Sequence, residues 1–166
     1  MTERLIHYTP EPFVFEHRLV EQADPATFPL KPHGLWVSVE GNMDWREAAE
    51  DMFGTEGLRH ATLITLAPDA NLLRLTTARD IDRFTEKYSR TFDESLPKLG
   101  RSIDWRLVAA EHQGLIVAPY QFSRRLTQHT FWYYGWDCAS GCIWDTAAIA
   151  SVEAIQEVER EEAKRG

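Results

Sequence analysis

The chain has 166 residues, enough for one domain with a sizeable buried core and too few for two. Hydrophobic residues make up 43% of it and charged residues 27%, which excludes the low-hydrophobicity composition of a disordered chain. Acidic residues outnumber basic ones by 26 to 18, and the formal charge of −8 argues against non-specific binding to nucleic acid.

The sequence also bears on compartment and on metal binding. No apolar run approaches the roughly 20 residues that span a bilayer, and the first residues lack the basic-then-apolar order of a signal peptide. We therefore expect a cytoplasmic protein with no membrane partner. Cys138 and Cys142 have no second cysteine pair and no closely spaced histidine pair beside them, so we expect two buried thiols, no metal and no disulfide.

The N-terminal quarter of the chain predicts a strand, a helix and a second strand. Residues 4–8 are typical of a short strand. Apolar residues at helical spacing then follow two prolines and predict a helix from about Glu11. A Pro-rich loop leads to a strand at 35–40, in which Trp36 and Ser38 alternate with apolar side chains. One face of that strand should lie in the core and the other should face a cleft.

The middle of the chain predicts helices and strands in mixed order. They are a helix at 42–54, strands at 59–68 and 71–77, a helix at 78–92 and a polar connection at 93–103. The first of these helices has the plainest signals, because Asn42 or Asp44 can cap its start and Gly54 follows its last apolar residue.

The C-terminal part completes a mixed pattern. It comprises a helix at 104–113 with a strand as the alternative, a strand at 114–120 that Pro119 ends or places at an edge, a strand at 141–144 and a helix from about 146. This order predicts a single α+β domain over residues 1–166 rather than a doubly wound parallel sheet. No glycine-rich phosphate loop is present, which disfavours the usual nucleotide-binding folds.

Several side chains are candidates for chemistry, each with a plainer alternative. His7 is either a hydrogen-bond donor to a ligand hydroxyl or a core or surface histidine with a satisfied ring. Trp36 is either a stacking platform or packing. Asp137 and Asp145 are either an acid and base pair or solvated loop carboxylates. Ser140 lacks the G-x-S-x-G frame of a hydrolase, which leaves it a turn residue by default.

Three motifs taken in order resemble the signature of the ADP-ribosyltransferase superfamily. They are LIHYT at 5–9, GLWVS at 34–38 with an alanine-bearing helix after it, and SGCIWDTAAI at 140–149. The resemblance implies a split, mainly antiparallel β core with flanking helices and NAD as a co-substrate. It also implies cleavage of the nicotinamide–ribose bond and transfer of ADP-ribose to an acceptor, as in a toxin or a phage-type modifier.

The resemblance assigns a role to each matching residue. His7 would bond the ribose next to adenine, with Tyr8 and Thr9 beside it at the cofactor. Trp36 would stack on nicotinamide and Ser38 would hold the nicotinamide ribose. In such a site a flat aromatic ring holds the leaving base and the strands bind the ribose. This arrangement stabilises a cation-like transition state.

The third motif departs from the family pattern. Ser140 stands where the family often has Glu, and the nearest carboxylate is that of Asp137, three residues earlier. Ser140 and Asp137 are therefore the candidate catalytic residues, and the acceptor stays open between a nucleobase, a nucleic acid and a protein, with an inactive binder as a further outcome. The late strand should be core on its Cys142 and Trp144 side, with its start as a third wall of the site.

An alternative function of another class uses different residues. The stretch from Trp132 to Trp136 is rich in aromatic side chains. Exposed, these would form a surface for a partner protein or a single-stranded nucleic acid, and buried, they would be ordinary core. Arg124 and Arg125 just before it either grip a phosphate or form a solvated pair.

Overall fold

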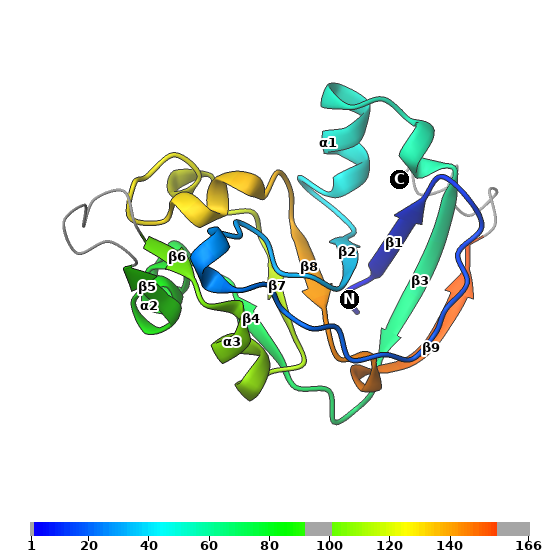
Figure 1. The fold of residues 1–166 in the computed structure, drawn as a ribbon. Coiled ribbons are helices and arrows are strands. Elements are labelled where there is room, and N and C mark those ends of the chain that lie inside the picture. Colours follow the sequence, from blue (N-terminus) through cyan, green and yellow to red (C-terminus); the bar gives the residue numbers. More distant parts are fainter. Residues whose placement is uncertain (1, 92–100, 156–166) are drawn as a thin grey trace.

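The protein is seen in a computed structural model that describes residues 2–91 and 101–155 (Figure 1). The large sheet contains β1 (Leu5–Thr9), β2 (Leu35–Val39), β3 (His60–Leu66), β4 (Leu72–Leu75), β7 (Gly114–Val117), β8 (Ser140–Ile143) and β9 (Ile149–Ala154). A small sheet pairs β5 (Ser89–Thr91) with β6 (Arg101–Ile103). The α-helices are α1 (Trp45–Met52), α2 (Ala78–Tyr88) and α3 (Trp105–Glu111). None of the helices in the two described ranges has the length and apolar character that a membrane crossing needs.

The large sheet is curled and mostly antiparallel. Its strand order is β4-β7-β8-β2-β1-β3-β9, and only the β4–β7 pair is parallel. The prediction of a mixed α+β domain is therefore confirmed. Every residue of β7 and β8 is buried, as expected for central strands that are covered on both faces.

The sheet opens between β1 and β2. These strands pair only at Leu5↔Val39 and Ile6↔Ser38, whereas β1 pairs with β3 along all of its length and β2 pairs with β8 at four positions. Figure 1 shows β1 slanting away from β2. Beyond Ile6 the two strands are no longer paired through their backbones, so side chains can lie between them.

Two apolar clusters hold the sheet, one on each face. Alternate residues of β7 divide between them, with Leu115 and Val117 in one cluster and Ile116 in the other. In β2 likewise, Val37 belongs to the second cluster and Trp36 packs against the first. The predicted division of β2 into a core face and a second face is confirmed.

The larger cluster is built from the aromatic stretch. Trp132, Tyr133 and Trp136 are each at most 2% exposed and pack with Phe84 and Trp105 from α2 and α3. The prediction of a binding surface that includes Trp132 and Trp136 is therefore wrong, because the rings of both residues lie in the core between the sheet and the helices. Such rings bury more apolar area than any other side chain, which explains why they lie inside.

The start of α1 follows the predicted signals. Asp44 caps the helix by accepting from the backbone N–H of Glu47 at 3.0 Å, and the Glu47 carboxylate accepts from the N–H of Met43 at 2.8 Å. The N–H of Trp45 donates to the Ser38 hydroxyl at 2.8 Å. This last bond ties the first turn of α1 to strand β2.

The helix predicted from about Glu11 is wrong. Residues 10–18 have no regular structure, and a single bridge joins Leu19 to Asp145. Phe13 and Phe15 are half-buried while Val14 between them is 78% exposed, so burial alternates as in an extended chain. The apolar residues at helical spacing do not share one buried face here, which removes the main stabilisation of a short helix.

The helix predicted from about residue 146 is also wrong over the part that the structure describes. A 3-10 turn at Thr146–Ala148 leads into β9, which pairs antiparallel with β3. Without β9, the outer edge of β3 would present unpaired backbone groups, and pairing them outweighs the helix propensity of an alanine-rich segment. Residues 156–166 of that predicted helix lie outside the described residues.

The other predicted elements are present with shifted ends. The helix at 78–92 ends at Tyr88, where β5 begins, and the segment at 104–113 is a helix rather than a strand. Strand β7 ends at Val117, just before the cis peptide bond between Ala118 and Pro119. Of the connection predicted at 93–103, residues 101–103 form β6 and the rest lie outside the described residues.

A buried hydroxyl inside the aromatic cluster is open to a direct test. Thr85 accepts from the indole N–H of Trp132 at 2.8 Å and donates to the carbonyl of Ile81 at 2.8 Å. Thr85→Val keeps the shape and leaves the indole N–H unpaired, so the free energy of unfolding should fall by about 1–3 kcal/mol in urea titrations. The control is Thr85→Ser, which keeps the hydroxyl and should lose only about 1 kcal/mol. A valine variant as stable as the wild type would contradict this account.

Candidate functional site

A pocket of about 240 Å³ lies where β1 and β2 separate. We call it the main pocket. The predicted site residues that line it are His7, Tyr8, Trp36, Ser38, Asp137 and Ser140. They come from β1, β2, the loop before β8 and β8 itself. Thr9 is the exception, since its hydroxyl donates to the carbonyl of Glu11 at 2.6 Å and it does not line the pocket.

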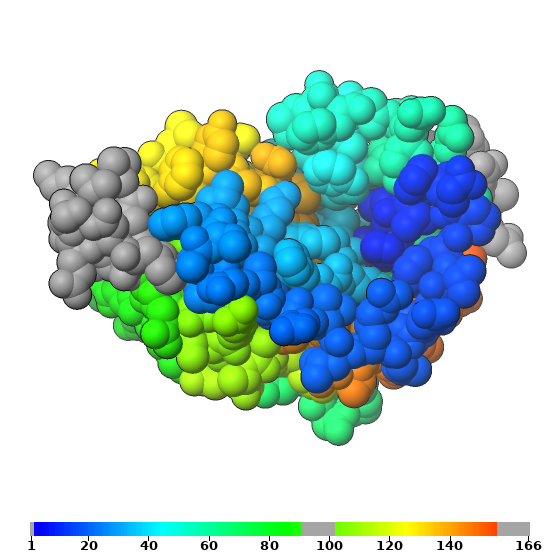
Figure 2. Space-filling view, in the orientation of Figure 1, coloured from blue at the N-terminus to red at the C-terminus, as the bar shows by residue number. Residues whose placement is uncertain are grey.

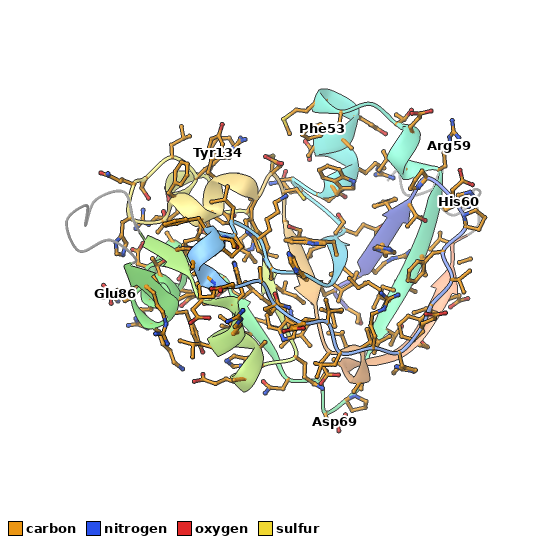
Figure 3. All side chains as sticks on the ribbon, viewed as in Figure 1. Phe53, Arg59, His60, Asp69, Glu86 and Tyr134 are labelled. Carbon is orange, nitrogen blue, oxygen red and sulfur yellow. The ribbon has the colours of Figure 1, made fainter. Side chains whose placement is uncertain are left out.

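The pocket lies between two parts of the chain that are far apart in sequence. Trp45 contributes from the first turn of α1, and Trp136 and Asp137 contribute from the segment that leads into β8. Figure 2 shows a notch between α1, in cyan, and the yellow and orange residues before β8. Phe53 and Tyr134 mark the two sides of this notch (Figure 3).

His7 bridges the opening between the two strands. Its Nδ1 lies 2.6 Å from the carbonyl oxygen of Trp36, and since a carbonyl only accepts, Nδ1 carries the proton. Burial holds the pKa of His7 below its ordinary value of 6.5, although the bond to Trp36 acts against this. The neutral ring therefore presents an acceptor at Nε2 to a ligand hydroxyl, where we expected a donor.

Trp36 presents an aromatic face in the pocket. It is half-buried, and its ring meets that of Trp136 edge to face with centroids 4.9 Å apart. The ammonium of Lys31 lies 5.3 Å from the centre of the Trp36 ring. The face of this indole thus attracts a cation in the structure as it stands.

Ser38 and Ser140 face one another across the β2–β8 ladder and are both buried. Ser38 accepts from the N–H of Trp45, which leaves its hydroxyl proton available to a ligand. Ser140 donates to the carbonyl of Cys138 at 3.0 Å, which leaves its oxygen available as an acceptor. The two serines therefore supply one donor and one acceptor to the pocket.

Among the described residues that line the main pocket, Asp137 alone carries a carboxylate. Its Oδ1 accepts from Nη2 of Arg125 at 3.1 Å. Asp145, the other predicted acid or base, accepts from the N–H of Ala147 and from the side chain of Gln113, and does not line this pocket. The structure therefore does not bring the two aspartates together as a catalytic pair.

The two cysteines do not supply a nucleophile. Both are free and buried, and Cys138 lines the pocket. Burial raises the pKa of the Cys138 thiol to about 11 and raises that of Cys142 as well, so both stay protonated near neutral pH. Within residues 2–91 and 101–155, no group of three His, Cys, Asp or Glu side chains is placed to hold a metal ion.

A second pocket of about 250 Å³ adjoins the first, since His7 lines both. Phe13, Phe15, Arg18 and Gly34 are among its other residues. The ring of Phe13 meets that of His7 edge to face at 4.5 Å. Sequence reasoning missed this pocket because it placed the segment in a helix, although the alternation of aromatic and other residues there was a signal for an extended chain.

The lowered pKa of His7 predicts how stability depends on pH. Because the pKa of His7 is lower in the folded chain, the unfolded chain binds more of this proton as the pH falls, so the free energy of unfolding should fall on acidification from about pH 7 to about pH 5. His112, whose pKa burial also lowers, acts in the same direction. Urea unfolding at several pH values should show a smaller slope in His7→Gln than in the wild type. An unchanged slope would mean that His7 titrates alike in both states.

Comparisons with known proteins found no relative of this chain. No family model, no curated protein and no solved structure matches the chain. What the two pockets bind is therefore inferred from their own residues.

Proposed function

We propose that the protein is a cytoplasmic, ADP-ribosyltransferase-like enzyme. It binds NAD, breaks the bond between nicotinamide and ribose, and transfers ADP-ribose to an acceptor. One observation supports this most directly: His7, Tyr8, Trp36 and Ser38, which the resemblance assigns to NAD, line one pocket together with the catalytic candidates Asp137 and Ser140. His7, Trp36 and Ser140 are far apart in the sequence, and the neighbouring strands β1, β2 and β8 bring them to one cavity.

The paired pockets favour a ligand with two parts. The volumes of about 240 and about 250 Å³ adjoin at His7, which suits a dinucleotide whose ribose hydroxyls lie near that residue. The nicotinamide half would occupy the main pocket, and the adenine half would extend toward Phe13 and Phe15. His7 would accept a hydrogen bond from a ribose hydroxyl at Nε2.

The electrostatics of the main pocket suit the reaction. The nicotinamide ring of NAD is a cation, and it would take the place of the Lys31 ammonium that lies over the Trp36 face. When the bond from ribose C1′ to the ring nitrogen breaks, its electron pair leaves with nicotinamide, which becomes neutral. The positive charge that develops on the ribose would lie near the carboxylate of Asp137, and Ser38 and Ser140 would orient the ribose.

A binding module remains a second candidate on one observation. Phe131 and Tyr134 are 53% and 46% exposed, and their rings stack at 5.7 Å and 6°. This exposed pair suits contact with a partner protein or a base of single-stranded nucleic acid. It is much smaller than the surface expected from residues 132–136, most of which is core.

The proposal is tested by titrating the protein with NAD while following tryptophan fluorescence and free nicotinamide. We expect saturable quenching and slow nicotinamide release. His7→Ala and Trp36→Leu should each weaken NAD binding about tenfold or more, because each removes a direct contact. His60→Ala is the matched control, since His60 is exposed at the start of β3 and lies at the edge of the molecule (Figure 3).

The outcomes separate the two candidates. Binding that is equally strong in His7→Ala and the wild type would contradict the role of His7. Binding without nicotinamide release would contradict the enzyme proposal and favour an inactive NAD-binding site. No binding at millimolar NAD would overturn the enzyme proposal and favour the binding module.

A further inference from the structure

Two neighbouring arginines hold their aspartates in different ways. Arg124 contacts Asp82 at two points, from Nε at 2.7 Å and from Nη2 at 2.8 Å. Arg125 contacts Asp137 at one point, from Nη2 to Oδ1 at 3.1 Å. The first is the usual paired geometry between a guanidinium and a carboxylate, and the second is not.

The contact between Arg125 and Asp137 does not use Nε of the arginine or Oδ2 of the aspartate. Nε of Arg125 is buried and has no hydrogen-bond partner among the described residues. Oδ1 alone of Asp137 contacts Arg125, so the guanidinium does not engage Oδ2, and Asp137 lines the main pocket. A two-point contact like that of Arg124 would engage both carboxylate oxygens with the guanidinium.

The surroundings hold both partners in place. The guanidinium of Arg125 lies over the ring of Tyr134, 5.6 Å from its centre. The hydroxyl of Tyr120 donates to the carbonyl of Trp136 at 2.6 Å, which anchors the residue just before Asp137. The side chains of Arg125 and Asp137 are only 27% and 20% exposed, so solvent screens this pair less than a pair on the open surface.

We propose that Arg125 is a positioning residue that turns Oδ2 of Asp137 into the main pocket, where this oxygen acts as the base for the incoming nucleophile. The inference rests on the proposed function. It places the carboxylate of the reaction before β8, in place of the acid that Ser140 does not supply. Arg125 acts only through Asp137 and touches no reacting atom.

The reaction replaces nicotinamide on ribose C1′ with the acceptor. The bond between ribose C1′ and the nicotinamide nitrogen breaks, and its electron pair leaves with nicotinamide. A new bond forms between C1′ and an oxygen or nitrogen of the acceptor, or of water when no acceptor is present. The proton of that nucleophile passes to Oδ2 of Asp137 and from there to solvent.

The experiment compares Arg125→Met, Asp137→Asn, the double variant R125M/D137N and Arg125→Lys with the wild type. For each we would measure the Kd for NAD by tryptophan quenching, kcat for nicotinamide release, and Tm. Arg124→Lys is the matched control, because it disturbs the neighbouring ion pair outside the pocket.

We expect kcat to fall about 100-fold or more in D137N and at least about tenfold in R125M, with the Kd for NAD changed less than about twofold. The double variant should be no slower than D137N, because Arg125 acts through Asp137. R125K, which keeps a donor and a charge, should recover part of the loss. R124K should lower Tm and leave kcat unchanged.

The contrary results are distinct from failure of the proposed function. If R125M keeps the wild-type kcat, or if the two single losses multiply in the double variant, Arg125 does not act through Asp137 and the inference is wrong. Should R125M fail to fold, Arg125→Gln replaces it under the same criteria. A wild type that releases no nicotinamide overturns the proposed function and this inference together, whereas a loss confined to the variants bears on the inference alone.

Discussion

The candidate site depends on the early separation of two neighbouring strands. β1 and β2 share only two paired positions. Beyond them, the ring of His7 donates a hydrogen bond to the carbonyl of Trp36, which would accept from a backbone N–H if the ladder continued. That single bond satisfies the half-buried carbonyl of Trp36, fixes the tautomer of the histidine and holds its ring between the two strands. Without it, either the strands would close and remove the main pocket, or a backbone acceptor would be left unpaired.

The walls of the main pocket belong to elements that the sheet and the aromatic cluster also hold in place. β2 and β8 are central strands, and their facing serines are also bonded to the start of α1 and to the loop before β8. Trp136 belongs to the large aromatic cluster and packs edge to face on Trp36. Packing energy from the core is thereby used to orient polar groups at the opening, which is how a binding site keeps its geometry before a ligand arrives.

Most local elements followed from the sequence where local signals agreed with tertiary pairing. Helix α1 was predictable because Asp44, Glu47 and Gly54 act within a few residues of one another. The segment after Pro12 was mispredicted because its helical spacing was accidental, and the segment at 149–154 because an edge of β3 lies there to be paired. Both errors come from partners more than 80 residues away in sequence, which no local pattern contains.

The residue pattern alone predicted the mixed α+β class and the alternation that puts Trp36 and Ser38 on one face of β2, and it named the residues for which we propose a role in dinucleotide binding. Which of these residues meet depends on the fold. The fold places Asp137 at the main pocket and Asp145 outside it, and it buries Trp132 while Tyr134 stays exposed. Because Nδ1 of His7 donates to Trp36, Nε2 is left as an acceptor. The physical reason is that strand patterns specify which face a side chain occupies, whereas the pairing of strands distant in sequence specifies what lies opposite it.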